Sequence, residues 1–455
     1  MDTWIGRSAA QIAEAVRSGA VEPRDVVQQH LERIERLNPQ LSAFRRIRHE
    51  EALAEADRLA VRPDLAELPL AGVPIAVKDN VEVAGEQTRN GSAASPTTTS
   101  PVDHPVVARL RAAGAIVVGL TNVPELCLVG MADSVYGIAR NPWDRERTPG
   151  GSSGGSAAAV SAALVPLAHG NDGLGSIRIP SACCGLVGIK PGTGVVPVSL
   201  DGTPKWHGLS ENGPLGTTVR DAALGLSVMA GDPKLAEPGE PGALRIGLSV
   251  RSALAGLPID PAGVAAATET GDLLTTLGHT VGAHTARYPA WLGPATLRTW
   301  YSCAYEDAAS LDSAHLDRRT RRLAGVGRVL SLAHFDGSGG RARWRSGAAD
   351  AFFGDIDVLV LPSLAAVPTP ARRYGERGAI INTVMSVKVA SLFGAWNIAG
   401  WPAMNVPAGV HKAGTPLGVQ LIARPGGERL LLGLAAQLEA ARPWQRHAPE
   451  YSTES

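Results

Sequence analysis

Cysteine is scarce in this sequence, and neither sign of charge is in surplus. Four cysteines (Cys127, Cys183, Cys184 and Cys303) are spread over 455 residues without a CxxC pair, which excludes a disulfide framework and offers no zinc site. The adjacent Cys183 and Cys184 are expected to be small buried packing residues. The chain has 43 lysine and arginine residues and 43 aspartate and glutamate residues. It therefore lacks the surplus of positive charge that attracts nucleic acid or anionic lipid. We therefore expect a small-molecule ligand, with neither nucleic acid nor membrane as a partner.

Long hydrophobic runs are also missing. No apolar run approaches the roughly 20 residues that a membrane span needs. The first stretch, MDTWIGRSAAQIAEAVRSG, has the pattern of an amphipathic helix rather than of a signal peptide. We therefore expect a cytoplasmic protein. No repeat period and no long linker divide the chain, which favours one large domain over residues 1–455.

Helical and strand-like segments alternate along the chain, which is typical of an α/β fold. Apolar positions at helical spacing predict helices over 9–37, 48–61, 104–114, 217–230, 261–277, 290–310, 341–353 and 427–441. Short buried runs predict a first strand in LPLAGVPIAVKDN that ends at Lys78, Asp79 and Asn80, and others over 115–119, 244–250, 357–363, 402–409 and 417–423. Glycine and serine beside charges in HFDGSGGRAR, 334–343, predict a mobile loop.

The glycine-rich tract TPGGSSGGSAAAV, 148–160, matches several motifs loosely. A phosphate-binding loop would need a lysine and then a hydroxyl where Ser156 and Ala157 stand, so that interpretation fails. A dinucleotide fingerprint needs a preceding strand, whereas the turn-rich NPWDRERTP precedes this tract. The nucleophile-elbow pattern GxSxG fits around both Ser152 and Ser153, so a match in this glycine-rich stretch is weak evidence for a nucleophile. Taken alone, the tract is best interpreted as glycines at the start of a helix.

Two further stretches change that interpretation. In HGNDGLGSIRIP, Ser176 follows Gly175, and successive backbone N–H groups behind small residues can point at a developing oxyanion. In VPIAVKDN, Lys78 ends an otherwise apolar run. Burial of such a lysine lowers its pKa, so the neutral amine could replace histidine as a general base.

Together these stretches resemble the amidase signature family. GGSSGGS is followed by a GSIRxP-type segment, and Ser176 stands 24 positions after Ser152, as in the family. The similarity covers nearly the whole chain and includes LSAFRRI, GVPIAVKDN, VARLRAAGAIVVGLTNVPEL, NPWDRERTPGGSSGGSAAAV, GLVGIKPG, NGPLGTTVRDAALGLSVMAG and NIAGWPAMNVPAG…LGVQLIARPGGERLLLGLAAQLE. The resemblance implies a single α/β domain with a central mixed β-sheet flanked by helices. Its parts would be a helical segment over about 1–65, a signature core over about 66–230, and a C-terminal half with a substrate-specificity region over about 290–350.

The resemblance implies an amidohydrolase that splits a carboxylic amide into acid and ammonia or amine, without a metal or organic cofactor. Ser176 matches the nucleophile, Ser152 the bridging serine and Lys78 the base. The Gly151–Ser152 peptide bond is expected to be cis. The implied intermediate is an acyl-enzyme.

The loop before the nucleophile departs from the family pattern. Members commonly read Asp-Thr-Gly-Gly-Ser, whereas this chain has Asp172-Gly173-Leu174-Gly175-Ser176. We still expect the oxyanion-binding amides from Gly173, Leu174 and Gly175, because backbone donors do not depend on the side chain.

Several residues near these motifs are expected to support the site. We expect Asp172 and Arg178 to form a buried ion pair that fixes the nucleophile loop. Ser153 is expected to brace the turn by hydrogen bonding, Ser156 to start a helix, and His169 to be a packed histidine. A second group, Met131, Trp300 and Tyr301, could line the acyl pocket, although aromatic residues near helices are more often core.

Two alternatives stay open beside hydrolysis: an amidotransferase A-type subunit and a non-catalytic binding protein on the same scaffold. Such subunits usually carry glutamine where this chain has Ile179, which argues against the first. The presence of Lys78, Ser152 and Ser176 together argues against the second. Aliphatic, aryl, urea-type and cyclic amides all remain candidate substrates, and a homodimer is a family-level expectation.

Overall fold

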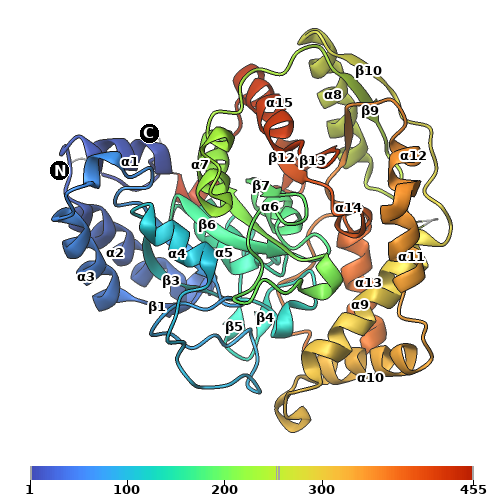
Figure 1. Ribbon diagram of the computed structural model, residues 1–455, viewed down its shortest axis with the longest axis horizontal. Coiled ribbons are helices and arrows are strands. Elements are labelled where there is room, and N and C mark those ends of the chain that lie inside the picture. Colours follow the sequence, from blue (N-terminus) through green and yellow to red (C-terminus); the bar gives the residue numbers. More distant parts are fainter. Residues whose placement is uncertain (1–2, 253, 255–256, 453–455) are drawn as a thin grey trace.

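A large mixed β-sheet runs through the middle of the protein, seen in a computed structural model that describes residues 3–252, 254 and 257–452 (Figure 1). Eleven strands of the described chain form this sheet. In spatial order they are β1 (Phe44–Ile47), β3 (Ile116–Thr121), β2 (Pro74–Lys78), β6 (Leu167–Asp172), β8 (Glu211–Gly216), β7 (Val187–Lys190), β12 (Ala403–Val410), β13 (Pro416–Ala423), β11 (Val358–Pro362), β9 (Arg245–Leu248) and β10 (Thr280–Ala283). A separate short hairpin joins β4 (Asp133–Ser134) to β5 (Gly137–Ile138).

Parallel pairing is confined to two places in the sheet. β2 pairs parallel with both β3 and β6, and β9 pairs parallel with both β10 and β11. The remaining neighbours are antiparallel. Every residue of β2 (PIAVK) and β3 (IVVGLT) is buried, as expected for strands that are covered on both faces. The predicted α/β class with a mixed central sheet is confirmed.

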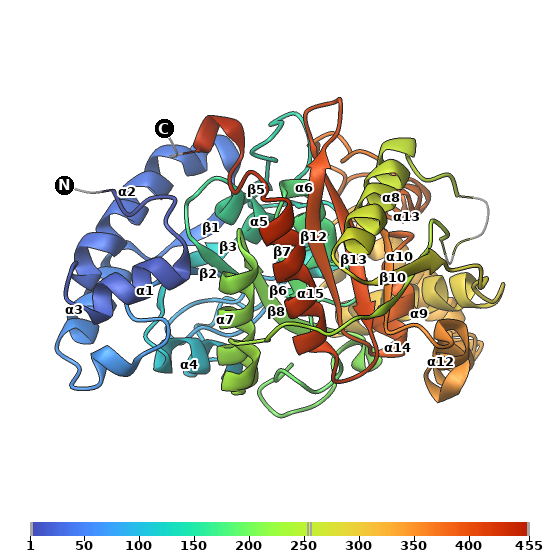
Figure 2. The same cartoon turned by 90° about the horizontal axis from the view of Figure 1, so that it is seen from above.

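Helices cover both faces and both ends of the sheet. They are α1 (Ala9–Arg17), α2 (Pro23–Leu41), α3 (His49–Ala60), α4 (Pro105–Ala112), α5 (Gly154–Ser161), α6 (Arg178–Cys184), α7 (Val219–Ala230), α8 (Pro261–Thr276), α9 (Leu292–Ala308), α10 (Arg318–Leu332), α11 (Ser338–Arg343), α12 (Ala349–Phe353), α13 (Ala379–Ala390), α14 (Gly394–Ala399) and α15 (Glu428–Ala441). The N-terminal helices α1–α3 lie at the β1 end, and α9–α13 lie at the opposite end of the molecule (Figure 1). Helices α7 and α15 pack on one face of the sheet, and α5 and α6 on the other (Figure 2).

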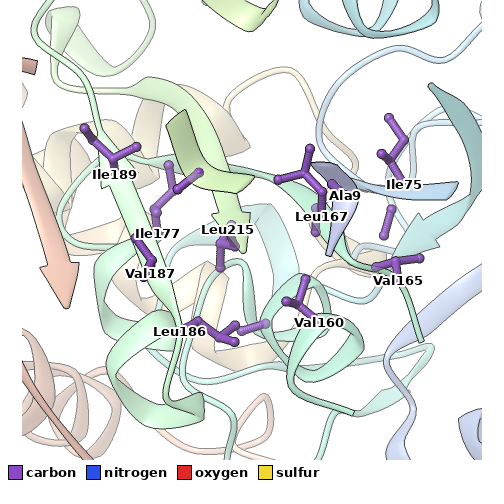
Figure 3. Packing of buried hydrophobic residues seen from close by; sticks show 14 of the residues in the cluster. Ala9, Ile75, Val160, Val165, Leu167, Ile177, Leu186, Val187, Ile189 and Leu215 are labelled. Carbon is purple, nitrogen blue, oxygen red and sulfur yellow. The ribbon is translucent and has the colours of Figure 1, made fainter. Parts of the chain in front are cut away.

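The main hydrophobic core lies between the sheet and these helices. Val160 of α5 and Leu186, just after α6, are buried against strand residues such as Leu167 and Leu215 (Figure 3). Cys183 and Cys184 are buried free thiols in this core, as predicted. The two cysteines therefore act as small apolar packing residues.

The helix predicted over 9–37 is two helices. A capping box between Ser8 and Gln11 begins α1, and Gly19, at φ 73°, lies in the turn that follows it. Pro23 then begins α2 at a position where its missing N–H costs nothing. The prediction of one continuous helix was wrong because it did not take account of the helix end near Gly19 and the new helix start at Pro23.

The prediction of a mobile loop over 334–343 is wrong for the second half of that segment. Residues 338–343 form α11, a π-helical turn occupies 344–348, and α12 completes the helix predicted over 341–353. Arg341 is buried, and its guanidinium donates to the Thr299 hydroxyl on α9 at 2.9 Å. This tertiary contact holds a glycine-rich sequence in a helix that its composition alone disfavours.

Candidate active site

Three segments that are far apart in sequence meet at one end of neighbouring strands. Lys78 is the last residue of β2 and Asp172 the last of β6, and these two strands are parallel neighbours. Carboxyl ends of parallel strands lie at the same edge of a sheet, so both residues reach the same place. The glycine-rich tract leads into α5, which packs on β2, β3 and β6.

Close backbone approach explains the glycines of the tract. A Cβ on Gly151 would collide with the backbone of Met131, and one on Gly155 would lie 2.6 Å from the Asn122 backbone nitrogen. All eight residues of α5, GGSAAAVS, are buried. Small side chains therefore let this helix lie directly on the strands that carry the site.

Lys78 is fully buried and faces the tract. Its Nζ donates to the Ser152 hydroxyl at 2.8 Å and to the Asn171 carbonyl at 3.1 Å. Burial lowers the pKa of Lys78 below its ordinary value, although the nearby Cys127 and Asp172 oppose that shift. The Lys78 ammonium therefore loses its proton more readily than an exposed lysine would, and it does so beside a hydroxyl group.

Ser152 and Ser176 share a cavity of about 430 Å³. Ser152 is buried and Ser176 is half-buried, and the Ser153 N–H donates to the Ser176 carbonyl at 3.2 Å. The Gly151–Ser152 peptide bond is cis, as expected. In the described part of the chain no hydrogen bond joins the two serine hydroxyls, so the structure brings them to one cavity without linking them directly.

A buried ion pair shapes the loop before Ser176, as predicted. Arg178 Nε donates to Asp172 Oδ2 at 2.9 Å, and neither side chain is exposed to solvent. Burial alone would raise the pKa of Asp172, but the Arg178 guanidinium outweighs it and holds that pKa well below its usual range. Two residues that the sequence analysis did not find complete the pair: Asn397 donates to Asp172 Oδ1 at 2.8 Å, and Gln420 accepts from Arg178 at 3.1 Å.

The Asp172 carboxylate also accepts from the loop itself. The Gly175 N–H donates to Asp172 Oδ1 at 2.6 Å, and the Ile177 N–H to Asp172 Oδ2 at 3.2 Å. The Gly175 N–H is therefore already engaged, which narrows the expected oxyanion donors to Gly173 and Leu174. The Leu174 side chain points to an apolar cavity and forms part of its wall.

We expect Asp172→Asn to destabilise the protein by about 3 kcal/mol, because it leaves the buried Arg178 without its counter-charge. Asp312, which pairs with His315 on the surface, is a matched control, and Asp312→Asn is expected to change stability very little because exposed ion pairs contribute little. Denaturant and thermal unfolding measure both changes. Equal stability of the wild-type and Asp172→Asn proteins at pH 7 would contradict this prediction.

Folding lowers the pKa of Asp172, so the ionised carboxylate stabilises the folded protein at pH values above 3.8, the ordinary pKa. This stabilisation is lost as the pH falls below that value.

The other predicted supporting residues lie around α5. The Ser153 hydroxyl donates to the Asn171 carbonyl and accepts from its N–H, both at 3.3 Å. Ser156 is in the first turn of α5, and its hydroxyl donates to the His169 carbonyl at 2.9 Å. Burial lowers the pKa of His169 to about 3, so it is a neutral packed histidine.

A second cavity of about 80 Å³ adjoins the first. Trp300 lines it, and its indole N–H donates to the Leu128 carbonyl at 2.7 Å. Met131 and Tyr301 are not among its described lining residues. Of the three candidates for the acyl pocket, only Trp300 therefore borders a cavity at Ser176.

Neither a metal cluster nor a membrane-crossing helix is found in the described ranges. No group of three or more His, Cys, Asp or Glu side chains there is placed to hold a metal ion. No helix there is long and apolar enough to cross a bilayer.

Comparisons with known proteins identify the class to which this fold and motif order belong. Residues 25–432 match the family model described as Amidase, so the chain belongs to the amidase signature family. It is an amidase, a hydrolase that acts on amides.

Individual relatives are similar over their whole length. The putative amidase AmiB2 of Mycobacterium tuberculosis (strain ATCC 25618 / H37Rv) is 42% identical, with 99% of each chain covered. The acylamidase of Rhodococcus erythropolis is 32% identical, with 98% of this chain and 97% of the relative covered. A solved structure of 6-aminohexanoate cyclic dimer hydrolase complexed with substrate superposes with a TM-score of 0.86 at 28% identity, covering 98% of this chain and 99% of the other.

Proposed function

We propose that this amidase works through Ser176, Ser152 and Lys78 and forms an acyl-enzyme. The observation that carries the proposal is the contact of 2.8 Å between the Nζ of buried Lys78 and the Ser152 hydroxyl, in the wall of the cavity that also holds Ser176. A lysine whose pKa is lowered by burial can accept a proton near neutral pH.

In the acylation half-reaction, neutral Lys78 takes a proton from Ser152, which takes one from Ser176. The Ser176 oxygen then forms a bond with the amide carbonyl carbon, and the carbonyl π pair moves onto oxygen. The N–H groups of Gly173 and Leu174 stabilise that oxyanion, since the Gly175 N–H is held by Asp172.

Collapse of this intermediate breaks the C–N bond. Protonated Lys78 returns its proton through Ser152 to the leaving nitrogen, which departs as ammonia or an amine. Water then attacks the ester by the same relay run in the reverse direction. The relay requires a hydrogen bond between the Ser152 and Ser176 hydroxyls in the complex with substrate.

A serine-directed phosphonylating reagent tests which hydroxyl is the nucleophile. It should attach to one serine with loss of its leaving group, and peptide mapping by mass spectrometry should find the label on Ser176. The Ser176→Ala variant should remain unlabelled. Label on Ser152, Ser153 or an unrelated residue of the wild-type protein would overturn the proposal.

A further inference from the structure

The two cavities meet at Ser176 and differ in character. Cys127, Ser176 and Trp206 line both of them. A Cβ on Gly173 would lie 2.7 Å from the Trp206 ring, so this indole packs directly on the loop that precedes Ser176. Trp206 thus forms part of the boundary between two compartments, one on each side of the scissile bond.

The position of Ser152 indicates which compartment receives which half of the substrate. Ser152 lines the larger cavity and is not among the described lining residues of the smaller one. In the proposed mechanism, Ser152 must deliver a proton to the leaving nitrogen. The amine half of the substrate therefore lies in the larger cavity and the acyl half in the smaller one.

The two cavities differ in the charge of the residues that line them. The smaller cavity has no Asp, Glu, Lys, Arg or His among its described lining residues, and its walls include Leu128, Ile179 and Trp300. The larger cavity carries three carboxylates and one ammonium, which belong to Glu82, Asp201, Asp307 and Lys205. His104 also lines it, and burial lowers the pKa of that imidazole below its ordinary value, so it adds no charge at neutral pH.

Asp307 is the carboxylate that is fixed in place. It comes from α9, within the region 290–350, and its Oδ2 accepts the Trp206 indole N–H at 2.8 Å. Burial raises the pKa of Asp307 to about 6, because the carboxylate loses part of its hydration. A cation bound beside the carboxylate would compensate for that loss. This carboxylate is attached through Trp206 to the same loop that holds Ser176.

We propose that the preferred substrates are amides of an apolar carboxylic acid whose amine half carries a positive charge, and that Asp307 is a specificity-determining residue for that charge. The inference rests on the proposed function, because it uses the proton relay to orient the substrate.

Four amides of matched size test the inference on the full-length protein. Butanoic acid is joined to butylamine, to butane diamine, or to ω-aminobutanoic acid, which gives neutral, cationic and anionic amine halves. The fourth amide joins ω-aminobutanoic acid through its carboxyl group to butylamine, which moves the cation to the acyl half. We expect kcat/KM to be about ten-fold higher for the cationic amine half than for the neutral one. The anionic and acyl-cationic amides should be the poorest substrates.

Asp307→Asn removes the charge and keeps an oxygen that can accept from Trp206. It should bring the cationic-to-neutral ratio of kcat/KM close to one, and this ratio is the readout because any general loss of activity affects both amides alike. Asp312→Asn is the matched control: Asp312 pairs with His315 on the surface and is not among the described lining residues of the cavity. This control should keep the wild-type ratio.

The outcomes separate the inference from the proposed function. Turnover that is abolished in Ser176→Ala but shows no charge preference, or a preference that Asp307→Asn leaves unchanged, overturns the inference alone. Preference for the acyl-cationic amide, or no turnover of any of the four, overturns it as well. Turnover that persists in Ser176→Ala overturns the proposed function.

Discussion

Replacing Ser176 by alanine is expected to lower kcat/KM for a simple amide by about 10⁴-fold or more. The reason is that no other hydroxyl is proposed to attack the carbonyl, so the covalent route is lost while substrate binding is retained. Release of ammonia or amine measures the effect. Ser227→Ala serves as a control, because this residue lies on α7 and its hydroxyl donates to the Leu224 carbonyl of the same helix at 2.8 Å.

A double variant sharpens this prediction. If Ser176 and Lys78 act as one unit, the Ser176→Ala and Lys78→Ala changes together should be little worse than either alone. Losses that add fully in free energy would mean that the two residues act independently. That result would contradict the relay through Ser152.

Strong local patterns made much of the fold predictable. The strand predicted over 357–363 is β11 at Val358–Pro362, and the helix predicted over 261–277 is α8 at Pro261–Thr276. Both have a local cause: β11 is an uninterrupted apolar run, and Asp260 followed by Pro261 starts a helix at a defined residue. Such signals do not depend on the rest of the chain.

Strands at the centre of the sheet were harder to find from sequence. β6 reads LAHGND and β8 reads ENGPLG, and neither alternates or carries a β-branched residue. They are strands because they pair with each other, from Leu167 opposite Gly216 to Asp172 opposite Glu211. Pairing over such a sequence separation depends on tertiary structure, which overrides local propensity.

The residues of the candidate site also fall into those that local sequence predicts and those that depend on the tertiary structure. Lys78, Ser152 and Ser176 could be proposed from motif spacing because each lies in a distinctive short stretch. Asn397, which holds Asp172, and Asp307, which holds Trp206, come from helices 225 and 101 residues away from those partners. Asn397 begins the motif NIAGWPAMNVPAG and Asp307 lies in the predicted specificity region 290–350. Neither pattern shows which residue each side chain contacts, so the roles of these two residues are seen only in the folded chain.

Lys78→Arg is expected to lower kcat/KM by about 10³-fold or more at every pH. Arginine keeps the positive charge and length but is not deprotonated in proteins, so it cannot accept the proton of Ser152. In the wild type, protonated Lys78 is the inactive form, so kcat/KM should rise as the pH rises through the pKa of Lys78. Because burial lowers that pKa, the midpoint should fall below the ordinary value of 10.5. Initial rates across a pH series measure both effects, with circular dichroism to verify that the variant is folded. A folded Lys78→Arg variant that retains the wild-type pH profile would exclude Lys78 as the base.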